Sequence, residues 1–439
     1  MQTSRIHSGL WRQAEQQAAI VPQIYGGIDF SALPERFTVE PSGDGFEDFN
    51  HLVPGLMKDD TLVDLMAVYT MTGDAVADAY AARIADYGFG RLVRMLEVAC
   101  DAGIGAVRDA PPELAALIVA MERTPGWLDM DLVDKGARIE RNHYVHLVPF
   151  AIRGAFLATF MNKYSALPMA MTGNLTDSLA ARRVQDTATF FTLTVMPGAL
   201  RRYGPAFKAA AKVRLMHAMV RLNVMRQPGA WDSRVYGVPI PQVDQMPAGQ
   251  IGSLLIAFQA LREGRETFTA DERARIEIAR YRCFLLGLPE VLLGDTPRAI
   301  ARLMMARQAT LRAGFDDATC GALVRGTMNT ELAFDPSLQG RIDRELERSF
   351  SKAFFIRHFL RGDTARARKM GVTYTLKDRK LALVAAARIY SQLNLFKALA
   401  DIPVVRDVAD RLLVGKLNGL LKRYGRGDPA DAGGHMARG

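Results

Sequence analysis

The apolar residues of this 439-residue chain recur three and four positions apart over most of its length. This is the spacing of amphipathic helices. No convincing alternation with a period of two appears, and no segment repeats at a fixed interval. The sequence therefore predicts an all-α fold. Proline, glycine and helix-capping residues mark the ends of the expected helices, which cover residues 60–82, 88–102, 111–123, 129–164 with a bend at Pro149, 247–263, 269–286, 296–313 and 341–360.

Composition sets limits on the class of protein. With 49% hydrophobic and 23% charged residues, the chain can bury a sizeable core in one large or two ordinary domains. The apolar run at 146–161 is interrupted by Arg153, so it falls short of a membrane-spanning helix. Residues 1–26 show no secretory signal, so we expect a cytoplasmic protein. The three widely spaced cysteines predict neither a disulfide framework nor a metal-binding Cys pair.

Residues 176–226 are predicted to form two helices joined by a short turn. The first ends near Pro197, and the second begins at Pro205, directly after Gly204. Proline is common in the first turn of a helix. In the first helix, Arg183 and Thr187 are four residues apart and so share a face.

In the second helix, His217 lies within an apolar stripe, with Arg214 three residues before it and Arg221 four residues after it. Two such helices could hold a flat cofactor between them, as globins hold haem. The spacing also allows a hydrogen-bonded core histidine and a structural tie made by Arg183 and Thr187. No Cys-x-x-Cys-His motif occurs, so haem would be held without a covalent bond.

Short motifs in and around this helix pair add a family resemblance. They are Arg183–Thr187, Arg214–Arg221 and Gly237–Gln242, with Pro125–Asp129 and Thr172-Gly173 upstream and Leu285–Pro289 downstream. Together they resemble the rubber oxygenase (latex clearing protein) and MpaB family of haem b-dependent oxygenases. The resemblance covers roughly residues 60 to 300.

The resemblance implies a globin-like helical core that holds haem b between two antiparallel helices, with additional helices at both ends. His217 would ligate the iron, and Arg183 and Thr187 would lie near bound dioxygen. The second ring nitrogen of His217 should be held by a backbone carbonyl or a carboxylate. Arg214 and Arg221 could pair with the haem propionates or lie at the surface. The implied reaction uses dioxygen to cleave or oxygenate a C=C bond of an isoprenoid-like or other apolar substrate.

The sequence departs from the latex-clearing members at two places. Asp186 stands where a distal lysine is expected, and no Glu occurs in 160–182 to act as their proposed base. These departures argue against rubber as the substrate and leave a distal role of Asp186 open. Asp186 is also four residues from Arg182, which favours a simple helix ion pair. The alternatives are a haem oxygenase of another apolar or phenolic molecule and a non-catalytic helical haem- or lipid-binding protein.

The positive charge of the chain gathers near its C-terminus. Residues 351–428 contain 17 Lys and Arg against six Asp and Glu, whereas the net charge of the whole chain is +9. A basic amphipathic helix suits an anionic membrane surface, so we expect possible peripheral contact there, although a solvated helical face fits equally well. Nucleic acid is not expected, because interleaved aromatic residues are lacking.

The sequence is expected to divide into four segments. These are an irregular N-terminal extension (1–58), a haem-binding oxygenase-like helical core (59–345), a basic helical segment (346–428) and a disordered tail (429–439).

Overall fold

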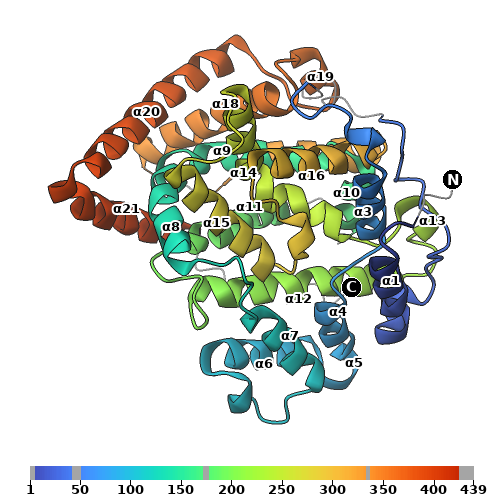
Figure 1. The fold of residues 1–439 in the computed structure, drawn as a ribbon. Coiled ribbons are helices and arrows are strands. Elements are labelled where there is room, and N and C mark those ends of the chain that lie inside the picture. The colour runs from blue at the N-terminus through green and yellow to red at the C-terminus, as the bar shows by residue number, and fades with distance from the viewer. Residues whose placement is uncertain (1–4, 42–50, 172–176, 333–336, 425–439) are drawn as a thin grey trace. The chain divides into compact units, whose positions relative to one another are not determined.

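The computed structural model describes residues 5–41, 51–171, 177–332 and 337–424 (Figure 1). In these ranges the chain forms helices and turns without a β-strand, and one isolated antiparallel bridge pairs Phe37 with Leu311. The prediction of an all-α fold is confirmed. The expected tail at 429–439 lies outside the described residues.

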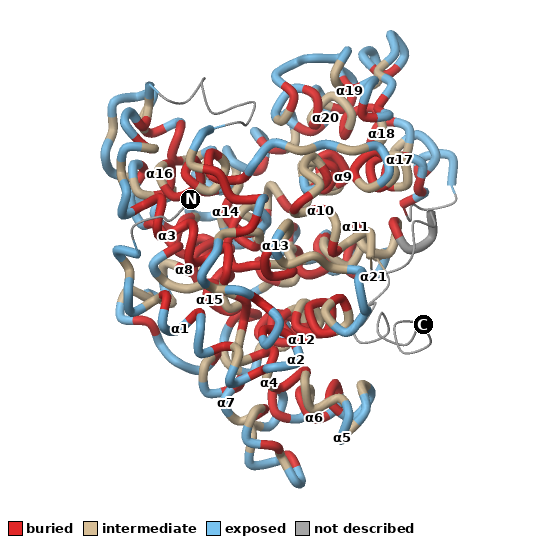
Figure 2. Tube along the Cα trace, turned by 90° about the vertical axis from the view of Figure 1, so that its right-hand side faces the viewer, coloured by how far each residue is buried: buried red, intermediate tan, exposed pale blue. Residues whose placement is uncertain are grey.

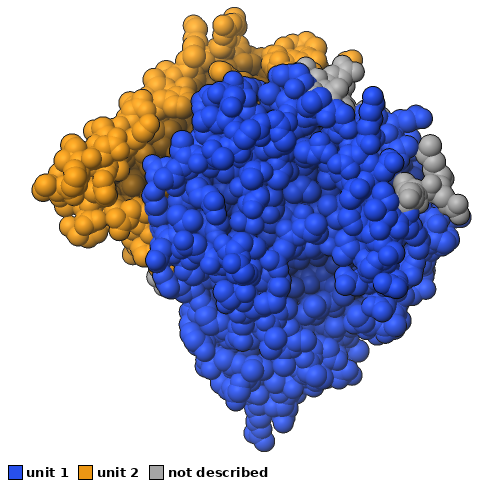
Figure 3. Space-filling view, in the orientation of Figure 1, with its two compact units in different colours: residues 1–136, 200–313, 433–439 blue, residues 137–199, 314–432 orange. Residues whose placement is uncertain are grey.

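The chain divides into two compact units, which Figure 3 shows in different colours. Among the described residues, unit 1 comprises 5–41, 51–136 and 200–313, and unit 2 comprises 137–171, 177–199, 314–332 and 337–424. Helix α8 (Met130–His146) begins in unit 1 and ends in unit 2. The expected segment boundaries at residues 58 and 345 rest on composition and resemblance, and they stay predictions.

Unit 1 contains the long helix α12 (Pro205–Arg226). It starts where the sequence predicted, because Gly204 is extended and Pro205 occupies the first turn. Figure 1 shows α12 above the short helix α4. Its neighbours in the unit are α2 (Pro22–Tyr25), α4 (Ala75–Ala82), α6 (Phe89–Ala102) and α15 (Ala270–Leu285).

The rest of unit 1 packs around α14 (Gln242–Arg262), which contacts α15, α16 (Pro297–Thr310) and α3 (Asp60–Thr70). The described remainder of the unit consists of α1 (Ser8–Ile20), η2 (Leu56–Lys58), α5 (Ile84–Tyr87), η3 (Ile104–Ala106), α7 (Pro112–Glu122), α13 (Ser233–Tyr236) and η5 (Glu290–Leu292).

Unit 2 is built on α18 (Leu338–Phe359), which packs against α9 (Val148–Leu157) and α20 (Leu376–Asp401). A Cβ at Gly154 would lie 2.4 Å from the carbonyl oxygen of Ser351, so only glycine lets α9 approach α18 this closely. The other elements are η4 (Ala158–Phe160), α10 (Lys163–Met171), α11 (Asp177–Thr194), η6 (Asp317–Gly321), α17 (Ala322–Asn329), α19 (Thr364–Lys369) and α21 (Pro403–Arg423). Buried residues line the inner faces of these helices (Figure 2).

Four local predictions need correction. The helix expected at 247–263 begins at Gln242, and Pro247 lies inside it rather than at its start. The stretch 8–20, expected to be irregular, forms α1, because the first proline of the N-terminal region is Pro22 and Gly9 in the first turn does not break the helix. The single helix expected at 60–82 is two helices, because Asp74 caps a new start through the backbone N–H of Ala77. The helix expected at 129–164 ends at His146, and a new helix begins with Pro149 in its first turn.

Candidate functional site

His217 lies half-buried on α12 in unit 1. Its Nδ1 is 3.2 Å from the side-chain oxygen Oε1 of Gln245 on α14. The ring makes no other hydrogen bond with a described residue. Burial lowers the pKa of His217 to about 4, and the charge of Arg221 acts in the same direction. The ring is therefore neutral at physiological pH, with one nitrogen held and the other available.

The hydrogen bond to His217 continues through a second glutamine. Gln245 Nε2 donates to Gln242 Oε1 at 3.0 Å, and Gln242 Nε2 donates to the carbonyl oxygen of Gly73 at 3.0 Å. The sequence had predicted a backbone carbonyl or a carboxylate beside the ring. The structure instead places a side-chain amide there, and the backbone carbonyl lies two steps further along.

Two buried ion pairs flank His217 on the same helix. Arg214 donates to Asp74 through Nε at 2.7 Å and through Nη2 at 2.8 Å. Arg221 donates through Nε to Asp78 at 2.8 Å and through Nη1 to the carbonyl oxygen of Ile240 at 3.1 Å. Both arginines are buried, so the surface position that the sequence left open is wrong. The possible contact with propionates stays a prediction.

The two carboxylates of this cluster differ in their pKa. Burial alone would raise the pKa of Asp74, but the charge and hydrogen bonds of Arg214 outweigh it and the net shift is downward. Burial raises the pKa of Asp78 to about 6, against the charge of Arg221. Tyr25 also donates a hydrogen bond to Asp78. Asp74 is thus firmly ionised, whereas Asp78 holds its charge less strongly.

Glycines let the backbone come close to this cluster. Gly287 has φ +88°, and a Cβ there would lie 2.7 Å from Asp74 Oδ2 and 2.8 Å from Arg214 Nε. A Cβ at Gly73 would lie 2.0 Å from the hydroxyl oxygen of Tyr25. Gly287 lies within the motif Leu285–Pro289, so this motif has a packing function beside the ion pair.

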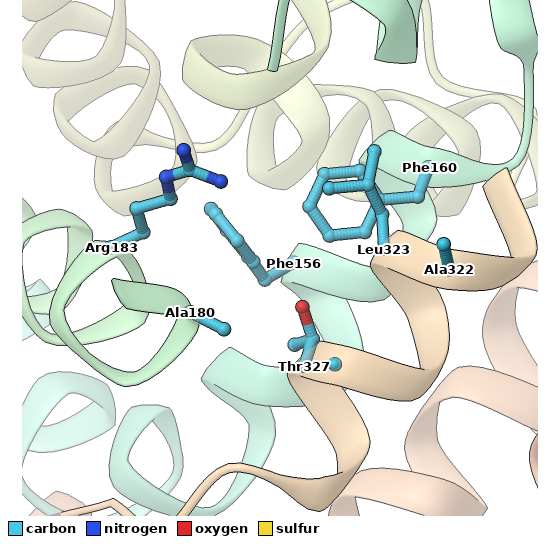
Figure 4. Close-up of a pocket in the computed structure, with 8 residues that line it drawn as sticks. Phe156, Phe160, Ala180, Arg183, Ala322, Leu323 and Thr327 are labelled. Carbon is cyan, nitrogen blue, oxygen red and sulfur yellow. The ribbon is translucent and has the colours of Figure 1, made fainter. Parts of the chain in front are cut away.

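Arg183 and Thr187, the predicted distal residues, lie one turn apart on α11 in unit 2. Arg183 borders a small pocket with Phe156 and Phe160 of the preceding helices and Leu323 and Thr327 of α17 (Figure 4). The pocket has a volume of about 10 Å³, which is room for about one water molecule. Burial lowers the pKa of the Arg183 guanidinium.

Asp186 lies beside these residues on α11. Its carboxylate is 3.8 Å from the guanidinium of Arg182, which is the predicted helix ion pair, although both side chains are partly buried rather than fully exposed. Burial raises the pKa of Asp186 to about 6, and Arg182 only partly offsets this.

The helical periodicity of the sequence does not identify the residues that pack against α12, which are Asp74, Asp78, Gln242 and Gln245. One signal was present, because Asp78 is the only charged residue in the apolar stretch 75–82 and a buried charge needs a partner. The described residues contain no group of three or more His, Cys, Asp or Glu that could hold a metal ion. A haem iron, however, needs only one axial side chain.

The described residues form an all-helical protein with His217 and its ion-paired neighbours on α12, and comparisons with known proteins identify the family. The sequence profile described as "ER-bound oxygenase mpaB/B'/Rubber oxygenase, catalytic domain" matches residues 143–392, which is more than half of the chain. The chain therefore belongs to this family of oxygenases, and the family suggested by its motifs is confirmed. The matched range begins and ends later than the stretch of roughly 60 to 300 expected from the motifs.

The fold is similar to that of a solved latex clearing protein in its closed state. The TM-score is 0.54 at 18% sequence identity, and the match covers 81% of this chain and 91% of the other. No match was found among curated proteins. As a member of an oxygenase family, the protein belongs to the oxidoreductases.

Proposed function

We propose that this protein is a haem b-dependent oxygenase that uses dioxygen to cleave or oxygenate a C=C bond of an isoprenoid-like or other apolar substrate. The observation that carries the proposal is the state of His217. Its ring is neutral, it is held at Nδ1, and Nε2 makes no hydrogen bond with any described residue. A neutral imidazole with one nitrogen available is the form that ligates iron.

The cluster around His217 also fits a bound haem. Arg221 Nη2 is buried and has no hydrogen-bond partner among the described residues, so this cation retains a donor for a propionate. Arg214 donates through both Nε and Nη2 to Asp74. Of the two predicted propionate contacts, we therefore favour Arg221. When bound, haem would supply an iron centre that activates dioxygen.

Arg183 and Thr187 are proposed as the hydrogen-bond donors that stabilise negative charge developing on dioxygen. This role rests on the resemblance of the segment Arg183–Thr187 and on the position of both residues on one face of α11. The phenyl rings of Phe156 and Phe160 beside Arg183 make its surroundings apolar, which strengthens electrostatic interactions.

The first experiment asks whether the chain binds haem through His217. The purified protein, reconstituted with haem b, should show a Soret band, and His217→Ala should abolish it. His146→Ala is the matched control, since burial also lowers the pKa of His146 to about 4. The control should retain the band. A band that persists in His217→Ala or disappears only in His146→Ala would refute the ligand assignment.

The second experiment separates an enzyme from a haem carrier. We expect the reconstituted protein to consume oxygen when an isoprenoid alkene is added, and Arg183→Ala to lose most of this activity while it keeps its haem. Arg182→Ala, one residue away on α11, should retain the activity. Equal turnover in wild type and Arg183→Ala would show that the distal assignment is wrong.

We also propose that the helices α20 and α21 contact an anionic membrane, from which an apolar substrate could be drawn. No helix among the described residues has both the length and the apolar character needed to cross a bilayer. Exposed apolar side chains nevertheless lie on both helices: Leu383, Val384, Tyr390 and Leu395 on α20, and Val404, Val408 and Leu412 on α21. Exposed basic residues alternate with them, namely Arg379, Lys380, Lys397, Arg406 and Arg411.

This combination of apolar and basic side chains suits the surface of a bilayer that contains anionic lipid. Sedimentation with phosphatidylserine-containing vesicles should exceed sedimentation with neutral vesicles at low salt, and Lys380→Glu/Lys397→Glu should remove the difference. Equal sedimentation with both kinds of vesicle would contradict the contact. The cytoplasmic location expected from the sequence stays a prediction.

A further inference from the structure

The amide group of Gln245 has a definite orientation, and a backbone carbonyl determines it. The two ends of a glutamine amide have the same outline, but one end donates and the other accepts hydrogen bonds. A neighbouring group that can only donate or only accept is therefore needed to tell the two ends apart, and the backbone carbonyl of Gly73 is such a group. Its carbonyl oxygen can only accept, so the end of Gln242 that lies 3.0 Å away must be the NH₂ group.

The orientation of the Gln242 amide then determines the orientation of the Gln245 amide. The oxygen of Gln242 faces Gln245 at 3.0 Å, so the facing end of Gln245 is its NH₂ group. The oxygen of Gln245 must then face His217 Nδ1 at 3.2 Å. An oxygen that accepts requires a nitrogen that donates. The proton of the neutral ring therefore sits on Nδ1, and Nε2 carries the lone pair.

Reversing this chain would be costly. It would bring the oxygen of Gln242 against the carbonyl oxygen of Gly73, and two acceptors repel. Gln242 and Gln245 are only 2% and 8% exposed, so water cannot easily satisfy the displaced groups.

The Gly73 peptide, whose carbonyl fixes the orientation of the two glutamines, is itself held by hydrogen bonds from two sides. The N–H of Gly73 donates to Gln17 Oε1 at 2.9 Å, and the N–H of Gln242 donates to the carbonyl oxygen of Thr72 at 2.9 Å. Gln17 is 2% exposed and comes from α1. The segment before α4 is thus fixed between α1 and α14, so the Gly73 carbonyl keeps its direction.

We propose that Gln245 is the positioning residue of His217 and that Gln242 sets its orientation from the Gly73 carbonyl. The pair selects the tautomer with the proton on Nδ1, which leaves Nε2 as the ligating atom. Because the acceptor is a neutral amide and not a carboxylate, it does not draw the Nδ1 proton away, and the ligand stays a neutral imidazole. The identity of the metal centre rests on the proposed function, whereas the tautomer does not.

The first test therefore uses the full-length protein without haem. Nitrogen-15 NMR of the histidine rings distinguishes the two tautomers, and His217→Gln identifies the signal. We expect His217 in the wild type to carry its proton on Nδ1. Gln245→Leu removes the acceptor of the Nδ1 proton and should shift the population toward the Nε2–H form.

Two further variants test whether the tautomer depends on the hydrogen-bond relay from Gly73 through Gln242 and Gln245 to His217, or only on general packing. Gln242→Leu leaves Gln245 in place but removes the side chain that fixes its orientation, so we expect a mixture of tautomers. Gln250→Leu is the matched control, because Gln250 is a buried glutamine on the same helix that donates to the carbonyl oxygen of Leu292. It should leave the tautomer unchanged. An Nε2–H ring in the wild type, or an unchanged ring in Gln245→Leu, would overturn the proposal.

The second test uses the haem-reconstituted protein. Gln245→Leu should weaken haem affinity about 10- to 100-fold, the usual effect of losing such an outer partner, and Gln250→Leu should not. Gln245→Glu should lower the reduction potential of the iron, because a carboxylate makes the imidazole a stronger donor. If the tautomer behaves as expected but no variant binds haem, the proposed function fails and the relay stands. If haem binds equally well to Gln245→Leu and wild type, the positioning role fails.

Discussion

His146 is held neutral in the folded protein by its surroundings. The residue is 9% exposed and lies against the ring of Phe396, with 5.1 Å between ring centroids. Burial lowers its pKa to about 4, and the charges of Lys416 and Arg388 act in the same direction. The unfolded chain has no such constraint, and its histidines titrate near pH 6.5.

Stability should therefore fall as the pH drops from about 6.5 toward 4. In this window the unfolded state takes up a proton at residue 146 and the folded state does not, so protons favour unfolding. Between pH 7 and pH 5, His146→Gln should reduce the loss in free energy of unfolding by about 1–2 kcal/mol. Urea denaturation at both pH values measures this. The control is His51→Gln, at an exposed position, which should lose as much free energy of unfolding between pH 7 and pH 5 as the wild type does. An equal loss in the wild type and both variants would contradict the prediction.

At the scale of single elements, α12 is fixed to the segment before and within α4 at three successive positions. Arg214 pairs with Asp74, Arg221 pairs with Asp78, and His217 between them is linked to Gly73 through two glutamines. These contacts keep the face of α12 that carries Arg214, His217 and Arg221 turned toward the segment before α4 and α4 itself. They explain why the helix carries buried charges, which are stable only when they are paired.

Arg214→Met should destabilise the protein by about 3–5 kcal/mol, because it leaves the carboxylate of Asp74 buried without its partner. Arg226→Met provides the control on the same helix, since Arg226 is exposed in the last turn. A surface change of this kind should alter stability by about 0.5 kcal/mol or less. Thermal and urea denaturation followed by circular dichroism would compare the two. A similar loss in both variants would show that the ion pair does not anchor the helix.

The sequence predicted α12 well and its partners poorly, for a physical reason. Proline, glycine and apolar spacing act within a few residues, so the start of α12 at Pro205 and the inward position of His217 could be predicted. The ion pair of Arg214 joins residues 140 positions apart, and the contact of His217 with Gln245 joins residues 28 apart. Periodicity carries no information on which distant side chain meets which. The family resemblance located His217 and Gln242 in motifs, but only the structure relates them.

At the scale of the whole molecule, each compact unit has its own buried ionic centre. That of unit 2 is Arg153, which is 0% exposed. Its Nε and Nη2 each donate to Glu347 at 2.9 Å, and Nη1 donates to the carbonyl oxygens of Thr327 at 2.6 Å and Thr330 at 2.9 Å. One guanidinium thus joins α9 and α18 to α17 and the segment after it. The sequence had shown Arg153 only as an interruption of an apolar run.

Arg153→Met should destabilise unit 2 by about 3–5 kcal/mol, because it leaves the carboxylate of Glu347 and two carbonyl groups buried without their donor. Since every contact of this guanidinium lies within unit 2, amide hydrogen exchange should accelerate in α9, α17 and α18 and remain near wild type in α4 and α12. Arg153→Met/Glu347→Leu should recover part of the loss, because it also removes the unpaired charge. Exchange that accelerates equally in α12 would show that the two units unfold together rather than as separate cooperative bodies.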